Sequence, residues 1–446
     1  MGTIVAISSP KGRGALGVVR LSGPESLQIT STLAGNLGDI QPRYATLRTL
    51  ADPDTSAVID QALITYFAAP HSLTGEDVVE ISCHGSPVVL RRVIERAIQA
   101  GALAAGPGEF TLRALANGKL NLAQAEAIRD LIASQTQAAA HQAALQINGE
   151  LSIALGPFKS SLLDVIVVLE SALEFVEDDL AAPHGEKIVC DLRRIAAGVA
   201  KLAQTFSTGQ LIKDGIHVTL AGSPNVGKSS IFNKLLSIDR AIVTDIPGTT
   251  RDSLSEPIEI DGVPVWLTDT AGIRGSPDVI ENLGIERSVK HIARSDLVVA
   301  VLDGSRPVGP DDLEMLAQTR EVRRLVVANK SDLITHGCGD MSNVDLTVSA
   351  LTGDGIEELR AAILSKFERA VIEPGNLVVI NARHHDLLQS TVAELKRATE
   401  LLEEGRTEEL VLMPMHNALT LLGQITGETT PEEILSQIFA TFCIGK

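Results

Sequence analysis

The chain of 446 residues is poor in cysteine, in aromatic residues and in positive charge. Its four cysteines, Cys83, Cys190, Cys338 and Cys443, lie far apart without a Cys-x-x-Cys pair, which argues against a disulfide framework or a zinc site. Aromatic residues make up only 3 %, so platforms for stacking single-stranded nucleic acid are scarce. With 38 basic and 56 acidic residues the net charge is −18, so any RNA binding would need a basic partner or a small local basic patch.

The chain also lacks the features of secreted and membrane proteins. Its N-terminus, Met-Gly-Thr-Ile-Val-Ala, has neither the charged start nor the long apolar run of a signal peptide, and it lacks the Ser or Thr that a myristoylation signal needs at position 6. No run approaches 18 uninterrupted apolar residues. We therefore expect a soluble, cytoplasmic protein with no membrane partner.

Hydrophobic patterning predicts a multidomain fold. Residues 1–118 alternate short β-type runs with turns and one helical pattern, which indicates an α+β N-terminal domain. Residues 119–212 and 371–446 carry apolar residues at helical spacing and predict an all-α helical domain in two parts. Between them, residues 213–370 alternate strands with helices, which predicts an inserted α/β domain with a parallel sheet.

Two local features concern the helices near the C-terminus. Pro414 lies where a helical pattern would otherwise continue, so we expect a break or kink there. Thr430, Pro431 and Glu433 have the spacing of a capping box, which predicts a helix that begins at Pro431 with Thr430 as its N-cap.

Residues 222–229 read Gly-Ser-Pro-Asn-Val-Gly-Lys-Ser, a full P-loop between a predicted strand (216–221) and a helix. The glycines let backbone N–H groups point at phosphates, Lys228 would reach the β- and γ-phosphates, and Ser229 would bind Mg²⁺. A glycine-rich turn alone could be structural. The complete spacing between strand and helix favours a P-loop nucleotide site.

Three further motifs follow at strand ends. In Asp269-Thr-Ala-Gly272 the carboxylate suits the Mg²⁺ shell and the glycine N–H can sense the γ-phosphate. In Asn329-Lys-Ser-Asp332 the last carboxylate can accept hydrogen bonds from guanine N1–H and N2, a donor pair that adenine lacks. Ser349-Ala350 then offers backbone N–H groups to guanine O6. The order of these motifs predicts GTP as the nucleotide.

The position that carries a water-orienting Gln in Ras-like GTPases is Ile273 here, so hydrolysis needs another polar group. Glu281 is a candidate, although on the residues alone a surface carboxylate is the simpler interpretation. Asn225 could help to hold a monovalent cation, and Thr250, in a switch-like segment (242–252), is the expected second Mg²⁺ ligand. The full set predicted to bind GTP is Asn225, Val226, Gly227, Lys228, Ser229, Ser230, Thr244, Asp245, Ile246, Pro247, Gly248, Thr249, Thr250, Asp269, Thr270, Ala271, Gly272, Asn329, Lys330, Ser331, Asp332, Ser349, Ala350 and Leu351.

Motifs along the whole chain resemble those of the MnmE (TrmE) family, GTPases of tRNA wobble-uridine modification. They are Gly12-Arg-Gly, Gly17-Val-Val-Arg20, Ser72-Leu-Thr-Gly-Glu-Asp77, His84-Gly85, Pro107-Gly-Glu-Phe110, Lys119-Leu-Asn-Leu-Ala-Gln-Ala-Glu-Ala-Ile128, Gly248-Thr-Thr-Arg-Asp252, Gly284-Ile-Glu-Arg287 and Phe442-Cys-Ile-Gly-Lys446. The resemblance implies a GTPase domain inserted in a helical domain, and a homodimer formed through a folate-binding N-terminal domain. It further implies activation by K⁺ and a heterotetramer with an FAD-binding partner, MnmG, that modifies C5 of the wobble uridine in certain tRNAs.

The resemblance also assigns roles to particular residues. Asn225 and the backbone of Thr244, Ile246 and Thr249 would hold K⁺, and Glu281 would orient the attacking water. Formyl-type or methylene-type tetrahydrofolate (5-formyl- or 5,10-methylenetetrahydrofolate) would bind at the positions Arg20, Glu80, Lys119 and Lys446.

Two questions stay open at this point. Cys443 fits either a small buried apolar thiol or a catalytic or redox role. The rival functions are a GTP-controlled ribosome-assembly factor without modification activity, and a folate-binding scaffold with a regulatory GTPase. Against the assembly factor, the chain has no KH-like Gly-x-x-Gly loop and no basic C-terminal extension.

Overall fold

The computed structural model describes residues 2–174, 182–239, 255–269, 295–333, 343–367 and 377–445. The chain forms two compact units. Unit 1 comprises Met1–Ile132, Ala143–Ala197 and Ser390–Lys446, and unit 2 comprises Ala133–Gln142 and Gly198–Gln389. Two long helices, α7 and α13, contribute residues to both units, so this division does not test the domain limits given above, which stay predictions.

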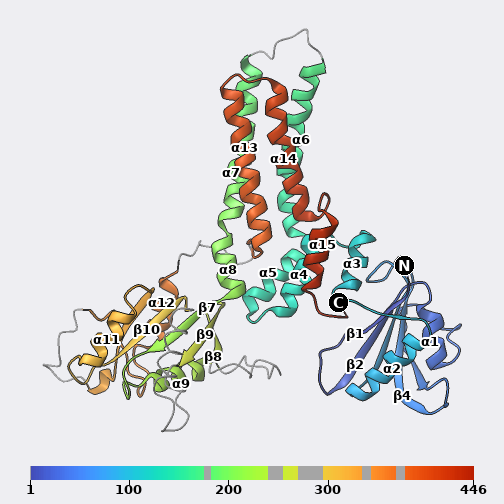
Figure 1. Cartoon of the computed structure of the whole chain (residues 1–446), viewed down its shortest axis with the longest axis horizontal. Helices are drawn as coiled ribbons and strands as arrows, with labels where there is room; N and C mark the ends of the chain where they lie inside the picture. Colours follow the sequence, from blue (N-terminus) through green and yellow to red (C-terminus); the bar gives the residue numbers. More distant parts are fainter. Residues whose placement is uncertain are drawn as a thin grey trace. The chain divides into compact units, whose positions relative to one another are not determined.

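Unit 1 begins with a six-stranded sheet in the order β3-β4-β5-β2-β1-β6, in which only the β1–β6 pair is parallel (Figure 1). Alternate residues of its strands, such as Val19 and Ile81, pack against α1 and α2, while Leu16 and Leu47 stay exposed. The result is the predicted α+β arrangement. Its elements are β1 (Ile4–Ile7), β2 (Gly14–Ser22), α1 (Ser26–Ala34), β3 (Thr46–Ala51), β4 (Val58–Phe67), β5 (Val78–Gly85), α2 (Pro87–Gln99) and β6 (Leu103–Ala104).

Helices make up the rest of unit 1. Helix α6 packs along α14, and Lys159 on α6 makes an ion pair with Glu428 at 2.8 Å. The helices are α3 (Glu109–Ala116), α4 (Leu122–Ala133), α5 (Gln137–Ile147), α6 (Glu150–Glu174), α7 (Ala182–Gln204), α13 (Ala382–Glu403), α14 (Glu408–Thr426) and α15 (Glu432–Ala440), of which α5, α7 and α13 extend into unit 2.

One stretch of α6, Glu150–Ser171, is long and apolar enough by length and composition to cross a membrane. A single stretch of this kind is weak support for a span, because core helices of soluble proteins meet the same criterion. The absence of a membrane partner therefore stays a prediction.

The helix break predicted at Pro414 and the N-cap predicted at Thr430 were wrong, and a kink at Pro414 stays a prediction. Helix α14 is not broken at Pro414, which is buried in the interior of the helix. Helix α15 has Pro431 as its N-cap residue, without a side-chain cap. Thr430 lies one residue before this N-cap, and its hydroxyl donates to the carbonyl of Gln424 at 3.1 Å.

Unit 2 contains the α/β sheet, in the order β12-β11-β10-β7-β9-β8 (Figure 1). All neighbours are parallel except β8, an antiparallel edge strand that the sequence patterns did not predict. Apolar residues of α9 and α12 cover one face, and α11 packs on β10. The elements are α8 (Phe206–Asp214), β7 (Ile216–Ala221), α9 (Lys228–Asp239), β8 (Ser255–Ile260), β9 (Val263–Asp269), β10 (Leu297–Asp303), α11 (Pro310–Gln318), β11 (Arg324–Asn329), η2 (Ser331–Leu333), β12 (Leu346–Thr347) and α12 (Ile356–Ser365).

The carboxyl ends of β7, β9, β10 and β11 meet at one edge of this sheet because the four strands are parallel and adjacent. In open α/β sheets ligands bind at such an edge. The P-loop, Asp269-Thr-Ala-Gly272 and Asn329-Lys-Ser-Asp332 lie at the ends of β7, β9 and β11, and Ser349-Ala350 follows the neighbouring strand β12.

Candidate functional site

The loop between β7 and α9 has the backbone of a phosphate-binding loop. Gly227 has φ 94°, and a Cβ there would lie 2.1 Å from Asn329 Nδ2. A Cβ on Gly222 would lie 2.4 Å from the carbonyl of Val301 on β10. Asn225 also adopts a left-handed conformation, with φ 64°. Two close approaches therefore require glycine at the positions where the motif has it.

Lys228, the first residue of α9, is buried, and its ammonium lies within the loop. Its Nζ donates to the carbonyls of Gly222 and Ser223 at 2.8 Å each. The cation is thus held beside the loop amides, where it can exchange these carbonyls for phosphate oxygens. The following residue, Ser229, donates its hydroxyl to Asp269 Oδ2 at 2.7 Å. A hydroxyl and a carboxylate at this distance are an oxygen donor set that suits Mg²⁺.

Asn329 joins the phosphate loop to the loop predicted to bind the base. Its Nδ2 donates to the carbonyl of Val226 at 2.9 Å, and its Oδ1 accepts from the N–H of Ala350 at 3.1 Å. The side chain is only 2 % exposed. One amide therefore sets the position of both ends of the site.

The next turn presents the carboxylate predicted to recognise guanine. Asp332 lies in the short helix η2, and its Oδ1 accepts a hydrogen bond from Ser349 Oγ at 2.6 Å. The residue itself is exposed, as is Leu351 at the far side of the loop. Ser349 thereby orients the carboxylate toward a ligand that approaches from solvent.

Two acidic residues of the site were missed by the motif analysis. Asp303, the last residue of β10, accepts from Lys330 Nζ at 2.6 Å. Burial raises the pKa of Asp303, but hydrogen bonds from Lys330 and Ser305 outweigh it and hold the pKa below its ordinary value. The only signal in the sequence was its place at the carboxyl end of a buried strand.

The second missed residue, Asp312 on α11, fixes the start of the phosphate loop. Its Oδ1 accepts from Ser223 Oγ at 2.6 Å, and Arg306 lies 3.0 Å from its other oxygen. Burial again raises the pKa of Asp312, and hydrogen bonds from Ser223, the Gly309 N–H and Arg306 lower it below its usual range. Asp312 is thus a buried, ionised anchor for the loop.

Several predicted residues lie outside the described part of the chain. These are Thr244, Asp245, Ile246, Pro247, Gly248, Thr249, Thr250, Thr270, Ala271, Gly272, Glu281 and Lys446. Their roles stay predictions.

In unit 1 the structure brings Arg20 and Glu80 together on adjacent strands. Arg20 donates from Nε and Nη2 to Glu80 Oε1 at 2.9 and 2.8 Å, and its guanidinium lies 5.8 Å from the ring centroid of Phe110. Lys119 is exposed, and its side chain lies beside the backbone of Gly75. No contact joins Lys119 to Arg20 within the described residues.

Cys443 is exposed, so the interpretation as a buried apolar thiol was wrong. The carbonyl of Cys443 accepts from the N–H of Gly108 at 3.3 Å, and Ile444 forms a β-bridge with Pro107. By contrast, Cys83 is buried, and burial together with Asp60 raises its thiol pKa to about 12. A thiolate role is therefore open to Cys443 but not to Cys83.

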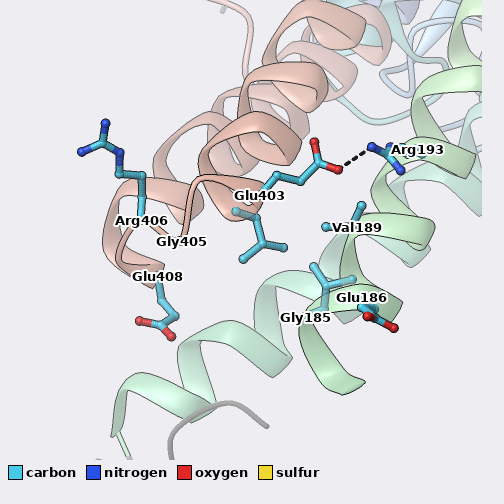
Figure 2. A pocket seen from close by; sticks show the side chains of 10 residues that line it. Gly185, Glu186, Val189, Arg193, Glu403, Gly405, Arg406 and Glu408 are labelled. Carbon is cyan, nitrogen blue, oxygen red and sulfur yellow. Dashed lines mark hydrogen bonds and ion pairs between the residues drawn. The ribbon is translucent and has the colours of Figure 1, made fainter. Parts of the chain in front are cut away.

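A separate pocket of about 580 Å³ lies between α7 and the turn that joins α13 to α14 (Figure 2). Its charged side chains are largely paired: Arg193 with Glu403, as Figure 2 shows, and Arg406 with Glu404. None of the predicted site residues lines it, and it offers no unpaired arginine to an anion. Among the described residues, no group of three or more His, Cys, Asp or Glu side chains could hold a metal ion.

Two family models match the chain. One, described as the MnmE helical domain, matches residues 122–443, and the other, described as the GTP-binding protein TrmE N-terminus, matches residues 3–119. Curated proteins named tRNA modification GTPase MnmE are similar along the whole chain. Those of Koribacter versatilis, Aquifex aeolicus and Geobacter sulfurreducens are 43 %, 42 % and 40 % identical, each covering 99–100 % of this chain and 99 % of its own length.

Proposed function

Because the chain belongs to the MnmE (TrmE) family of tRNA modification GTPases, we propose that it couples GTP hydrolysis to modification of C5 of the wobble uridine in certain tRNAs. It is a GTP hydrolase that acts in tRNA modification. The observation that carries the proposal is the joining of the phosphate loop to Asp269 and to the Asn329–Asp332 turn at one sheet edge. This arrangement occurs in a chain that is 43 % identical to a named tRNA modification GTPase.

The described contacts suggest a role for each side chain in GTP binding. Lys228 moves from the loop carbonyls to the β- and γ-phosphates, and Ser229 and Asp269 hold Mg²⁺ beside them. Asp332, oriented by Ser349, accepts from guanine N1–H and N2. With adenine the carboxylate would lose these donors, a penalty of about 1–3 kcal/mol or more.

Hydrolysis needs a water-orienting group and a positive charge. We assign the first to Glu281, since Ile273 cannot orient water, and the second to K⁺ held by Asn225 with the backbone of Thr244, Ile246 and Thr249. The place of Asn225 supports this, because an exposed residue with an amide side chain lies on the phosphate loop itself. A cation in place of an arginine finger supplies a contribution of about 10³–10⁵ in rate.

The one-carbon unit for C5 would come from a formyl- or methylene-tetrahydrofolate bound at Arg20, Glu80, Lys119 and Lys446. The Arg20–Glu80 pair supports this site, since a guanidinium suits the anionic glutamate tail and a carboxylate accepts from pterin N–H groups. The chain would act as a homodimer through its N-terminal domain, together with the FAD-binding partner MnmG. The acidity of the chain fits a complex in which the partner supplies much of the RNA binding.

Mass spectrometry of tRNA nucleosides tests the proposal. Cells that lack this chain should lose the aminomethyl-type modification of the wobble uridine, and a restored copy should return it. Unchanged nucleosides would reject the modification activity and favour a GTP-controlled ribosome-assembly factor instead.

A further inference from the structure

Both ends of the chain are free of acidic residues, although the chain as a whole is strongly acidic. The first Asp or Glu is Glu25, and no Asp or Glu follows Glu433. The two ends carry Lys11, Arg13 and Arg20 on one side and Lys446 on the other. In a chain with 56 acidic residues and a net charge of −18, these are segments where the local charge is positive.

The fold brings these two segments into contact. Ser8 donates its hydroxyl to the carbonyl of Gly445 at 2.9 Å, and a Cβ on Gly445 would lie 2.1 Å from the carbonyl of Ile7. Across β1 and β2, Ala6 pairs with Arg20. The C-terminal tail, with the exposed thiol of Cys443, therefore packs against the strand next to Arg20, where the proposed folate site lies.

A basic loop, residues 9–13, projects from this point between β1 and β2. Lys11, Gly12 and Arg13 are exposed, and Gly12 has φ 126° with open space where a Cβ would lie. Neither Lys11 nor Arg13 makes an ion pair within the described ranges of the chain. Most arginines of the same domain are paired with carboxylates, as Arg48 is with Asp39, although among its described residues Arg43 and Arg91 make no ion pair either. Two cations are thus presented to solvent without a carboxylate to neutralise them.

We propose that Lys11 and Arg13 bind backbone phosphates of the substrate tRNA a few nucleotides from the one being modified. This inference rests on the proposed function, because the uridine must approach the one-carbon donor beside Arg20. Arg13 lies seven residues before Arg20, and β2 begins at the next residue, so the two are roughly 23 Å apart along an extended strand. The loop would therefore contact phosphates a few nucleotides from the reacting base.

The low aromatic content of the chain favours contacts of this loop with phosphates over stacking on bases. With 3 % aromatic residues the chain has few stacking groups, and the loop 9–13 has none. Contacts of lysine and arginine with phosphates give binding that depends on salt rather than on sequence. The loop is therefore a positioning contact, and the choice of tRNA is made elsewhere.

The test is the salt dependence of binding between the full-length chain and an unmodified tRNA transcript that has uridine at the wobble position. For Lys11→Ala/Arg13→Ala, the slope of log affinity against log KCl should become shallower by about one for each cation that no longer meets a phosphate. Lys396→Ala/Arg397→Ala is the matched control, because it removes one lysine and one arginine from exposed positions on α13. The control should keep the wild-type slope, and Lys11→Arg/Arg13→Lys should also keep it.

Several outcomes would overturn the inference. They are a wild-type slope in the loop variant, an equal loss in the matched control, and wild-type protein without salt-dependent tRNA binding. Weaker binding of a polyglutamyl folate with unchanged tRNA binding would assign the loop to folate, and a shift from dimer to monomer would make it an interface between copies. If a wild-type copy restores the modified nucleoside in deleted cells while the loop variant keeps its slope, the proposed function stands and this inference falls.

Discussion

Asn329→Ala should uncouple the two ends of the nucleotide site. The substitution removes the hydrogen bond to the Val226 carbonyl at 2.9 Å and the one from the Ala350 N–H at 3.1 Å. Both partners are backbone groups, and Val226 is buried. Alanine cannot replace either bond, so the phosphate loop and the base loop lose their shared support.

The two hydrogen bonds set the size of the effect. A buried polar group left without a partner costs about 1–3 kcal/mol, so two such groups would cost about 2–6 kcal/mol. Ala350 is only partly buried, and water can satisfy its N–H in part, which favours the lower range of about 2–4 kcal/mol. Only the part of this cost that arises when nucleotide holds the two loops in place lowers the affinity; if all of it does, affinity for GTP or GDP falls about 30- to 700-fold, at about 1.4 kcal/mol for each factor of ten.

The assay is an equilibrium titration with a fluorescent guanine nucleotide, accompanied by thermal melting. Asn329→Asp should give an intermediate loss, because it keeps the acceptor for Ala350 but not the donor for Val226. Asn343→Ala, at an exposed turn before β12, is the matched control and should bind like the wild type. Affinity of Asn329→Ala within twofold of the wild type, with a native melting transition, would refute the argument.

Four further outcomes are expected. Gly227→Ala should abolish nucleotide binding because its Cβ would lie 2.1 Å from Asn329 Nδ2, and normal binding would show that the loop can open at no cost. Replacement of NaCl by KCl should raise the GTPase rate severalfold or more, and equal rates would remove the cation role of Asn225. Arg20→Ala should lose formyltetrahydrofolate in equilibrium dialysis yet still hydrolyse GTP; retained folate would contradict its assignment. Because folding lowers the pKa of Asp312, its ionised carboxylate stabilises the fold at pH values above its pKa in the unfolded state, and this stabilisation is lost as the pH falls through its pKa in the folded state. Asp312→Asn should therefore flatten the acid side of a plot of melting temperature against pH. An acid side as steep as that of the wild type would argue against this role.

Most of the parallel strands were predictable because they are short runs of largely apolar residues buried on both faces, although β12 is only two residues long and partly exposed. Leu297–Asp303 is an example, since its first six residues are apolar and fully or almost fully buried. Strand β8 (Ser255–Ile260) gave no such signal. Its sequence alternates polar and apolar residues around Pro257, a pattern of an antiparallel edge strand that resembles a loop in an α/β context. Burial on two faces leaves a clear sequence pattern, and burial on one face at an edge does not.

The predicted break at Pro414 and the predicted cap at Thr430 were wrong because the structure there depends on contacts outside the local sequence pattern. Pro414 weakens α14 locally, but the helix packs along α6, and packing supplies most of the stability of a helix in a protein. Thr430 has the right spacing for a cap, but α15 begins only at Glu432, and the Thr430 hydroxyl donates to the Gln424 carbonyl. The spacing of residues along the chain shows neither that α14 packs on α6 nor that Thr430 bonds to Gln424. It therefore could not have predicted the unbroken helix α14 or the later start of α15.

The motifs predicted a set of residues for the nucleotide site, but not how these residues support one another. Contacts within one motif join residues that are close in the sequence. The position of Lys228 next to the carbonyls of its own loop therefore follows from the spacing of the motif alone. Between motifs the contacts depend on strand order. Because β10 and β11 are adjacent, with Asp303 opposite Asn329, Lys330 of the following turn can reach the Asp303 carboxylate. The motif Asn329-Lys-Ser-Asp332 gives no sign of the Asp303 carboxylate, which lies on another strand. Asp303 and Asp312 belong to no motif, but they bond to the motif residues Lys330 and Ser223. Substitutions at either aspartate should therefore weaken nucleotide binding by releasing these motif residues.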